Sequence, residues 1–369
     1  CSMCGEPMSI NVHAKPAPEI FSTQPSDLWH YMDLLPVSDR DKVVSLGEGA
    51  TRLIGAPGVA EWAGCAEILL KNESSNPTGS FKDRQISVAI SHAREEGRDT
   101  VAVVSSGNVA CATSAYAARA GMRAVLLMHG HAAPQKLAQA AVYGGTVVRV
   151  DTPSASAVFD LCIAACERFG WAHLSTAGMY NPWNVEGAKT IAYELYQQTG
   201  GDLPDWIVAP VGGGGLLGGV WRGFLDLKDL GLIERIPRLV GVQAEGCAPL
   251  VKAVAEGMPF LETLKHPWPN PQTIAGGIAD DIIFDGHTAL PAIRTTGGAA
   301  VAVSDEDIVD GILTLARREG VWCEPTTGVV VAALKKLPGL EPHHRVACIV
   351  TGNGMKDPGA LRGRVAGVA

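Results

Sequence analysis

Lys82 is the residue whose type and position most clearly suggest chemistry. It follows an Asn-Pro-Thr-Gly turn at 76–79, and the apolar periodicity after the turn predicts a helix over 80–96 with Ser80 as its N-cap. A charged lysine in the first helical turn is disfavoured by the positive end of the helix dipole, whereas a neutral or covalently bound lysine is not. The position therefore suits a lysine that holds a cofactor, although an ordinary solvated lysine paired with a nearby acidic residue fits the same sequence.

Three other loops follow predicted strands and carry groups that bind ligands. Ser105-Ser106-Gly107 could hold a carboxylate, and Asn108 could donate a hydrogen bond to a phenolic oxygen. The four glycines at 212–215 precede a predicted helix, so their backbone N–H groups could hold a phosphate. Thr351, which follows the last predicted strand, could meet a ring nitrogen.

Each of these loops alone is also explained by a capped helix start or a polar turn. Together with Lys82 they offer partners for an aldehyde, a phenolic oxygen, a phosphate and a ring nitrogen. Pyridoxal 5'-phosphate carries all four groups, so we expect it as the cofactor.

The glycine-rich loop leaves a second interpretation open. Gly213, Gly215 and Gly218 satisfy G-x-G-x-x-G, and Glu245 ends the next predicted strand, where a ribose-binding acid could lie. This pattern indicates an NAD-binding oxidoreductase. However, Glu245 lies beyond the usual ~20 residues, and a dinucleotide would leave Lys82 unexplained.

The chain that positions these loops alternates strands and helices, which predicts an α/β fold with mostly parallel sheets in two three-layer lobes. We expect strands at 67–71, 100–105, 123–129, 146–151, 206–211, 238–244, 299–303 and 345–350. We expect helices at 80–96, 109–120, 133–143, 154–169, 185–199, 215–230, 247–256, 305–319 and 326–337. The Pro, Gly and Thr-rich segment 258–298 is the least regular and is expected to be a loop near a site.

The composition excludes several classes of protein. The 369 residues are 47% hydrophobic, and 30 basic against 38 acidic residues give a net charge of −8 without a basic cluster, so no nucleic acid partner is expected. No apolar run is long enough to span a membrane. Nine scattered cysteines predict reduced thiols and a cytoplasmic protein, and the Cys1-x-x-Cys4 pair lacks the second pair that a closed zinc site needs.

With these motifs the sequence resembles the fold type II pyridoxal phosphate enzymes, and among them threonine synthase. The similarity runs from about residue 45 to the end and is carried by NPTGSFKDR, SSGN, GGGGLLGG, VGVQAEGCAPL and TGNGMKD. It implies a large cofactor-binding domain formed by 1–85 and 186–369, and a smaller inserted domain at 86–185. By analogy it also implies a homodimer.

The resemblance assigns roles to individual residues. Lys82 would form the Schiff base and serve as the catalytic base. The residues that would bind the cofactor are Lys82, Asn108, Gly212, Gly213, Gly214, Gly215, Leu216 and Thr351. The residues that would bind the substrate are Ser105, Ser106, Gly107, Val109, Tyr180 and Asn184.

Several positions depart from the family pattern. Val109 stands where the family usually has Thr, and Gln85 stands where Gly is common. Gly178, Met179 and Asn184 replace the usual Asn, Ser and Arg. That arginine is expected to grip the phosphate of the substrate, and its loss removes a charge-assisted contact worth roughly 1.5–3 kcal/mol.

We therefore expect a lyase that acts on a hydroxy or O-phospho amino acid by β- or γ-elimination, as threonine synthase does. The alternative is a dehydratase or β-replacement enzyme for an unphosphorylated or differently substituted amino acid. A neutral hydroxyl at the ring nitrogen favours elimination over prolonged carbanion chemistry.

Overall fold

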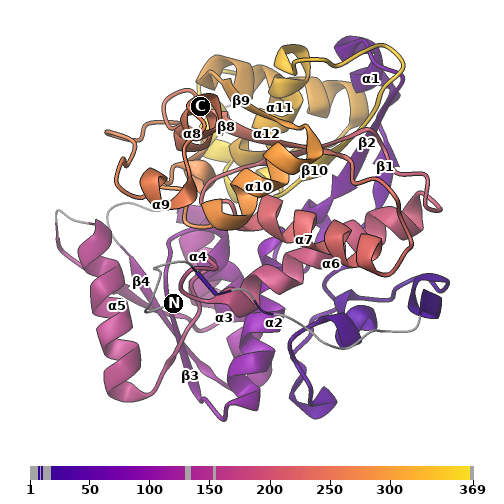
Figure 1. The fold of residues 1–369 in the computed structure, drawn as a ribbon. Coiled ribbons are helices and arrows are strands. Elements are labelled where there is room, and N and C mark those ends of the chain that lie inside the picture. Colours follow the sequence, from indigo (N-terminus) through magenta and orange to yellow (C-terminus); the bar gives the residue numbers. More distant parts are fainter. Residues whose placement is uncertain (1–6, 9, 11–17, 129–133, 153–154, 366–369) are drawn as a thin grey trace. The chain divides into compact units, whose positions relative to one another are not determined.

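In the computed structural model, the described residues are 7–8, 10, 18–128, 134–152 and 155–365. They divide into two compact units (Figure 1). One consists mainly of Thr51–Ser75 and Ile191–Ala369, and the other of Met8–Ala50 and Asn76–Thr190. The expected inserted domain at 86–185 lies within the second unit, and its expected boundaries stay a prediction.

The first unit contains a six-stranded sheet in the order β1-β2-β10-β7-β8-β9. The strands are β1 (Leu53–Gly55), β2 (Glu67–Asn72), β7 (Trp206–Pro210), β8 (Arg238–Ala244), β9 (Ala299–Val303) and β10 (Arg345–Val350). Only the edge strand β1 pairs antiparallel, and the other five strands are parallel. All five residues of β7 are buried, which is typical of a parallel strand covered on both faces.

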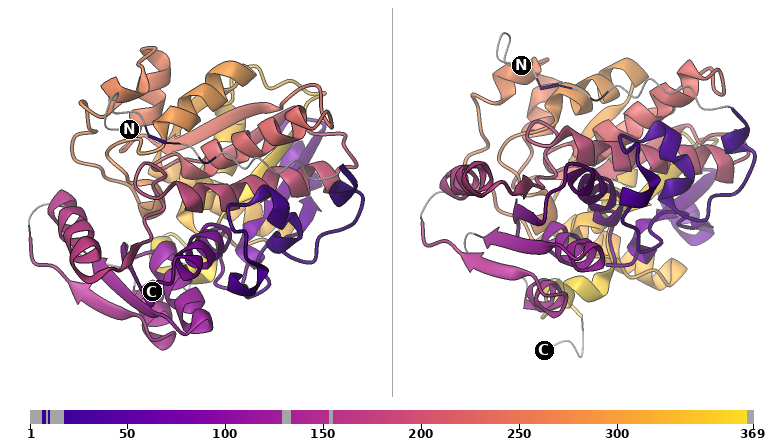
Figure 2. Two further views of the ribbon diagram at one scale, coloured as in Figure 1. Left: turned by 60° about the horizontal axis from the view of Figure 1, so that its bottom comes forward. Right: turned by 90° about the horizontal axis from the view of Figure 1, so that it is seen from below.

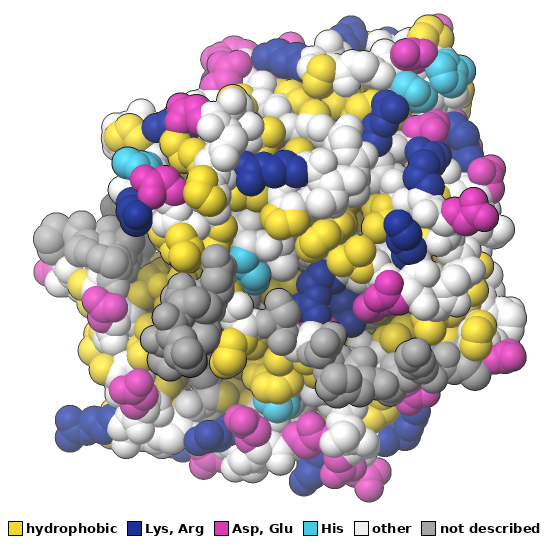
Figure 3. Space-filling model, in the orientation of Figure 1, with side chains coloured by type: hydrophobic (Ala, Val, Ile, Leu, Met, Phe, Trp, Pro, Cys, Tyr) yellow, Lys and Arg dark blue, Asp and Glu magenta, His cyan; other side chains and the backbone are white. Residues whose placement is uncertain are grey.

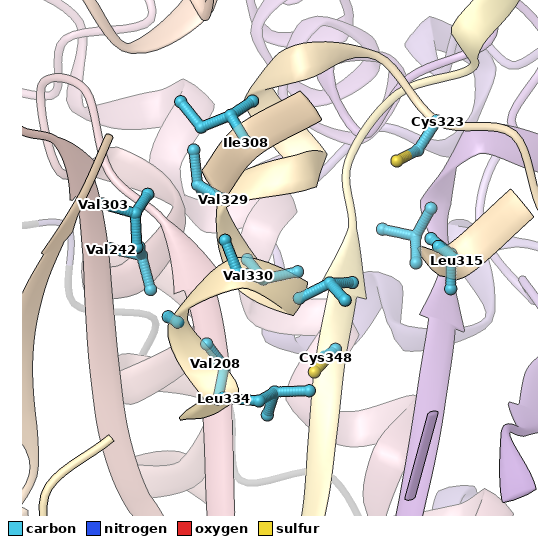
Figure 4. Close-up of a cluster of buried hydrophobic side chains, with 14 of the residues drawn as sticks. Val208, Val242, Val303, Ile308, Leu315, Cys323, Val329, Val330, Leu334 and Cys348 are labelled. Atoms are coloured by element: carbon cyan, nitrogen blue, oxygen red, sulfur yellow. The ribbon is translucent and has the colours of Figure 1, made fainter. Parts of the chain in front are cut away.

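Helices cover both faces of this sheet. One face carries α1 (Pro57–Ala63), α11 (Asp305–Glu319) and α12 (Pro325–Ala333), which form the main core with the strands. Figure 4 shows this core, with Val329 and Val330 of α12 beside Val208 and Val242 of the sheet. The other face carries α7 (Gly215–Asp229), α8 (Pro249–Ala255) and α10 (Gly286–Thr296), with α9 (Phe260–Thr263) against α10.

The second unit contains a four-stranded parallel sheet in the order β5-β4-β3-β6. The strands are β3 (Thr100–Val104), β4 (Arg123–Met128), β5 (Thr146–Arg149) and β6 (Ala172–His173). Val101 and Val103 face α2 (Lys82–Glu95), α3 (Asn108–Ala120) and α4 (Pro134–Val142), whereas Ala102 faces α5 (Ala155–Phe169). Alternate residues of β3 thus enter two cores, with helices on both sides (Figure 2).

The remaining elements join and flank the two sheets. Helix α6 (Pro182–Gln198) begins in the second unit and continues into the first. Short 3-10 helices lie at Pro18–Phe21, Leu28–Leu34, Arg40–Lys42, Glu73–Ser75, Gly276–Ile278, Leu334–Lys336, Gly354–Lys356 and Pro358–Leu361. None of the described helices combines the length and the hydropathy needed to cross a membrane.

The α/β fold and all eight expected strands are confirmed, with strand ends within two residues of expectation. The expected loop over 258–298 is confirmed for 264–285, which contains only the 3-10 helix Gly276–Ile278, whereas α9 and α10 lie on either side of it. Helix α10 includes Pro291 and four Gly or Thr residues, which hide its periodicity, and it is held by packing on α7 and β8. Strands β1 and β6 and helix α1 were also missed, because each is too short to show a period.

Seven described cysteines are free thiols, as expected, whereas Cys1 and Cys4 lie outside the described residues. On the face drawn in Figure 3, Lys and Arg side chains are interspersed with Asp and Glu.

Candidate functional site

Lys82 lies where the sequence predicts, at the first residue of α2. The prediction that Ser80 is the N-cap is wrong, however, because the N-cap residue is Phe81, which makes no side-chain capping bond. The Ser80 hydroxyl is fully buried and has no hydrogen-bond partner among the described residues. The turn is braced from inside the helix instead: Asp83 accepts hydrogen bonds from the backbone N–H of Thr78 at 2.9 Å and from its hydroxyl at 2.8 Å.

The amine of Lys82 donates hydrogen bonds to an amide oxygen and a hydroxyl oxygen. Its Nζ donates to Gln85 Oε1 at 2.9 Å and to Thr176 Oγ1 at 3.2 Å, and it lies 4.5 Å from the centre of the Phe81 ring. Neither acceptor was among the predicted site residues. The i, i+3 spacing of Lys82 and Gln85 could have indicated the first contact, but Thr176 lies in a loop without a recognisable motif.

Asn184 is linked to this amine through Gln85. Its Nδ2 donates to the carbonyl oxygens of Ser175 and Asn181, both at 2.5 Å. Its Oδ1 accepts from Gln85 Nε2 at 3.2 Å. Asn184 is fully buried, so the residue expected to bind the substrate uses its side chain within the protein.

The Ser-Ser-Gly-Asn loop follows β3 and precedes α3, as predicted. Ser105 Oγ accepts from the backbone N–H of Gly107 at 3.1 Å, and α3 begins at Asn108 without a side-chain cap. The N-cap residue of α3 is Gly107, which has no side chain that could accept from the first backbone N–H groups of the helix. Val109 packs against the hydrophobic core of the second unit, which gives this residue a structural role.

The loop after β6 lies at the same sheet edge as the loop after β3, because β3 and β6 are neighbouring parallel strands. This second loop carries Thr176 and Tyr180. The Tyr180 side chain is 40% exposed, and its ring lies 6.0 Å from Phe159 and 6.2 Å from His173. Burial of part of the ring, with a smaller contribution from Asp160, raises the pKa of Tyr180.

In the first unit, the glycine-rich loop follows β7 and leads into α7. Gly214 has φ 102°, a left-handed conformation that favours glycine, and it precedes α7 without a side-chain cap. A Cβ atom on Gly212 would lie 2.5 Å from Asp280 Oδ2, and one on Gly213 would lie 3.1 Å from Phe284. Part of the segment 258–298 thus packs directly against the loop and requires its small residues.

The other parts of the G-x-G-x-x-G pattern have structural partners as well. A Cβ atom on Gly218 would lie 2.1 Å from Thr288 Oγ1, so Gly218 permits the close packing of α7 on α10. Glu245 is 3.5 Å from Lys336 Nζ at the surface. Both residues are therefore explained without a dinucleotide.

Thr351 follows β10, which pairs directly with β7, so Thr351 and the glycine-rich loop share one edge of the sheet. Thr351 Oγ1 lies 2.9 Å from Thr327 Oγ1, and both residues are buried. Thr327 Oγ1 also accepts from the backbone N–H of Thr351 at 3.0 Å and of Gly352 at 3.2 Å. Since both lone pairs of Thr327 are used, its hydroxyl donates to Thr351, and Thr351 can donate its own hydrogen elsewhere.

Each unit contributes candidate residues that fit pyridoxal phosphate. The second unit provides the Lys82 amine, which donates to an amide and a hydroxyl, and the buried Ser80 hydroxyl, which has no partner among the described residues. The first unit provides an uncapped helix start at the glycine-rich loop, which suits a phosphate, and a hydroxyl donor at Thr351, which suits a ring nitrogen.

Comparison with known proteins defines the class. A family model described as "Pyridoxal-phosphate dependent enzyme" matches residues 44–352. The chain belongs to this family, and its cofactor is pyridoxal 5'-phosphate. This assignment confirms the expected cofactor and is evidence against the NAD-binding alternative.

Curated relatives narrow the class further. Threonine synthase of Methanocaldococcus jannaschii is 38% identical over 339 residues, or 90% of this chain and 81% of that protein. Threonine synthase of Methanosarcina acetivorans is 38% identical over 345 residues, or 92% and 82%. Threonine deaminase isoform 2 from Solanum lycopersicum, at 22% identity, shares the fold over 99% of this chain and 97% of that chain, with a TM-score of 0.72. The protein is a pyridoxal phosphate-dependent, threonine synthase-like lyase.

Proposed function

We propose that this lyase removes the β or γ substituent of a hydroxy or O-phospho amino acid, with Lys82 as the cofactor-binding lysine and catalytic base. The observation that carries the proposal is the Lys82 amine, which lies at the start of α2 between two neutral hydrogen-bond acceptors. In this assignment Asn108 meets the phenolic oxygen of the cofactor and Thr351 its ring nitrogen. The backbone of the glycine-rich loop, from Gly212 to Leu216, binds its phosphate.

Each group of the protein has a distinct task in this reaction. When bound, pyridoxal phosphate supplies an electron-withdrawing ring that stabilises negative charge on the α-carbon of the substrate. Ser105, Ser106 and the uncapped start of α3 hold the substrate carboxylate. Lys82 in its neutral form takes the α-proton. Thr351 donates to the ring nitrogen but cannot hold it protonated as a carboxylate would, which favours elimination.

The first candidate substrate is phosphohomoserine. Its conversion to threonine consumes one water molecule and releases inorganic phosphate. Support comes from relatives that carry the name threonine synthase at 34–38% identity over most of the chain.

The second candidate is an unphosphorylated hydroxy amino acid such as serine or threonine, which a dehydratase converts to a keto acid and ammonia. The hydrogen bonds of the Asn184 side chain favour this second candidate. Both Nδ2 hydrogens of this buried side chain bind backbone carbonyls, and its Oδ1 accepts from Gln85. Asn184 therefore has no donor left for a substrate phosphate, where the family pattern places an arginine.

The role of Lys82 is tested by reduction. Purified protein loaded with pyridoxal phosphate is treated with sodium borohydride, digested and analysed by mass spectrometry. We expect a single pyridoxyl adduct on Lys82 and none in the Lys82→Ala variant. An adduct on another lysine would overturn the assignment.

The substrate is tested by product analysis. If the protein is a threonine synthase, phosphohomoserine yields equal amounts of threonine and phosphate. If the second candidate is right, phosphohomoserine is not converted, whereas serine or threonine releases a keto acid.

Two properties are proposed by analogy and from composition: a homodimer and a cytoplasmic location. Analytical ultracentrifugation tests the first, and microscopy of a tagged protein in its host tests the second.

A further inference from the structure

Gln85 and Asn184 depart from the family pattern independently in the sequence, yet the structure joins them by a hydrogen bond beside Lys82. We propose that these two buried amides are positioning residues that fix the amine of Lys82 for cofactor capture and proton transfer. This inference rests on the proposed role of Lys82.

The orientation of the Asn184 amide is determined by its surroundings. Nδ2 lies 2.5 Å from the carbonyl oxygens of both Ser175 and Asn181. A carbonyl oxygen only accepts, so the flipped amide would place Oδ1 against two acceptors. Nδ2 must therefore face the loop, and Oδ1 must face Gln85.

The orientation of the Asn184 amide determines that of the Gln85 amide. Because Asn184 presents an oxygen, Gln85 must turn Nε2 toward it, at 3.2 Å. Oε1 of Gln85 then faces Lys82 Nζ at 2.9 Å. Both amides are fully buried, so water does not compete for these bonds.

Asn184 also holds the second acceptor of the amine. Thr176, 3.2 Å from Lys82 Nζ, directly follows Ser175, whose carbonyl oxygen is bound by Asn184. One buried side chain thus fixes Gln85 directly and Thr176 through the loop backbone. A lysine has four flexible carbons and three rotatable donors, so its amine needs such external restraint to stay in one place.

The hydrogen-bonded series Asn184–Gln85–Lys82, called the relay below, contains no charged acceptor, which suits a lysine that acts as a base. A carboxylate in place of Gln85 would favour the charged ammonium form, which cannot take a proton. An amide and a hydroxyl orient the amine without adding a full negative charge.

The test compares Gln85→Met, which keeps the volume but removes the relay, with Ser91→Ala. Ser91 lies on the same helix and is also fully buried, and its hydroxyl bonds Ser87 O at 2.7 Å and Val44 N at 2.8 Å. The first readout is the rate at which apoprotein captures pyridoxal phosphate, followed by the absorbance of the lysine adduct. The second is kcat and KM with the substrate that the unaltered protein converts.

We expect Gln85→Met to slow capture and to lower kcat by about 10- to 100-fold, with KM changed by less than about threefold, since misplacement of a reacting group by about 1 Å costs up to 10²-fold. Ser91→Ala should lower the melting temperature but keep capture and kcat. Asn184→Leu should resemble Gln85→Met, and the double variant should be no worse than Asn184→Leu alone.

If Gln85→Met behaves like Ser91→Ala, the relay is only a packing feature and the inference is wrong. If Gln85→Met does not fold, the isosteric Gln85→Glu replaces it, and full capture and activity in that variant would likewise overturn the inference. If the unaltered protein does not attach the cofactor at Lys82, the proposed function itself fails, which is a separate outcome.

Discussion

At the scale of single residues, the hydroxyl of Thr327 takes part in three buried hydrogen bonds. It is fully buried and accepts from two backbone N–H groups while donating to Thr351. An acceptor with two donors is hard to replace, because each buried N–H that loses its partner costs about 1–3 kcal/mol.

We therefore predict that Thr327→Val destabilises the protein by about 2–4 kcal/mol, because two backbone donors are left unsatisfied. Thr327→Ser keeps the hydroxyl and should cost only about 1 kcal/mol for the lost methyl group. Urea unfolding of both variants gives the comparison. Equal stability of the two would show that the hydroxyl is not needed as an acceptor.

The candidate residues could be predicted from the sequence to the extent that they belong to local patterns. Lys82 and Thr351 were found because a turn or strand end is followed by a recognisable run of residues. Gln85, Thr176 and Thr327 were not, because their roles depend on contacts with partners up to 99 residues away. No local pattern in the sequence shows whether the Asn184 side chain bonds other protein groups or binds a ligand.

At the scale of elements, parallel pairing decides which loops can act together. Helix positions and strand ends were largely predictable, because the apolar runs and turn residues mark them. The pairing of β10 with β7, and of β3 with β6, was not expressed in any local pattern. Yet this pairing places Thr351 with the glycine-rich loop, and the loop after β6 with the loop after β3.

The packing of α6 on α2 gives a prediction at this scale. Gly187 lies in α6, and a Cβ atom on it would lie 2.1 Å from the carbonyl oxygen of Arg84 in α2. Gly187→Ala should therefore force the helices apart and cost about 1–3 kcal/mol, despite the gain of up to about 1 kcal/mol in helix propensity. Gly55→Ala is the matched control, since nothing lies within 4 Å of its Cβ position.

Because α2 carries Lys82 and α6 carries Asn184, the same variant should also weaken cofactor capture. The measurements are thermal unfolding of the apoprotein and the rate of pyridoxal phosphate attachment. A Gly187→Ala protein as stable as Gly55→Ala would mean that the two helices separate without cost.

At the scale of the whole molecule, buried histidines make stability depend on pH. Burial lowers the pKa of His92, His173 and His287, the last to about 4. His92 and His173 belong to the second unit and His287 to the first, so both units carry a group of this kind. Nearby Glu95 and Glu96 oppose the effect of burial at His92 without cancelling it.

The sign follows from proton binding. In the unfolded chain these histidines bind a proton near pH 6.5, whereas in the folded protein His287 stays neutral down to about pH 4. Between these values the unfolded state holds more protons, so the free energy of unfolding falls as the pH falls from about 6.5 to 4. For His287 the loss should be about 1–3 kcal/mol, after allowance for its partial exposure to solvent.

Urea unfolding of the apoprotein at pH 7.5, 6.0 and 5.0 measures this loss, and use of the apoprotein removes the effect of cofactor binding on stability. His287→Gln should flatten the dependence on pH, because the variant has no imidazole to protonate in the unfolded state. His343→Gln, which removes a histidine with a 74% exposed side chain, is the control for the substitution itself. If His287→Gln and the unaltered protein lose the same free energy between pH 7.5 and 5.0, the acid sensitivity has its origin in the carboxylates and not in the buried imidazole.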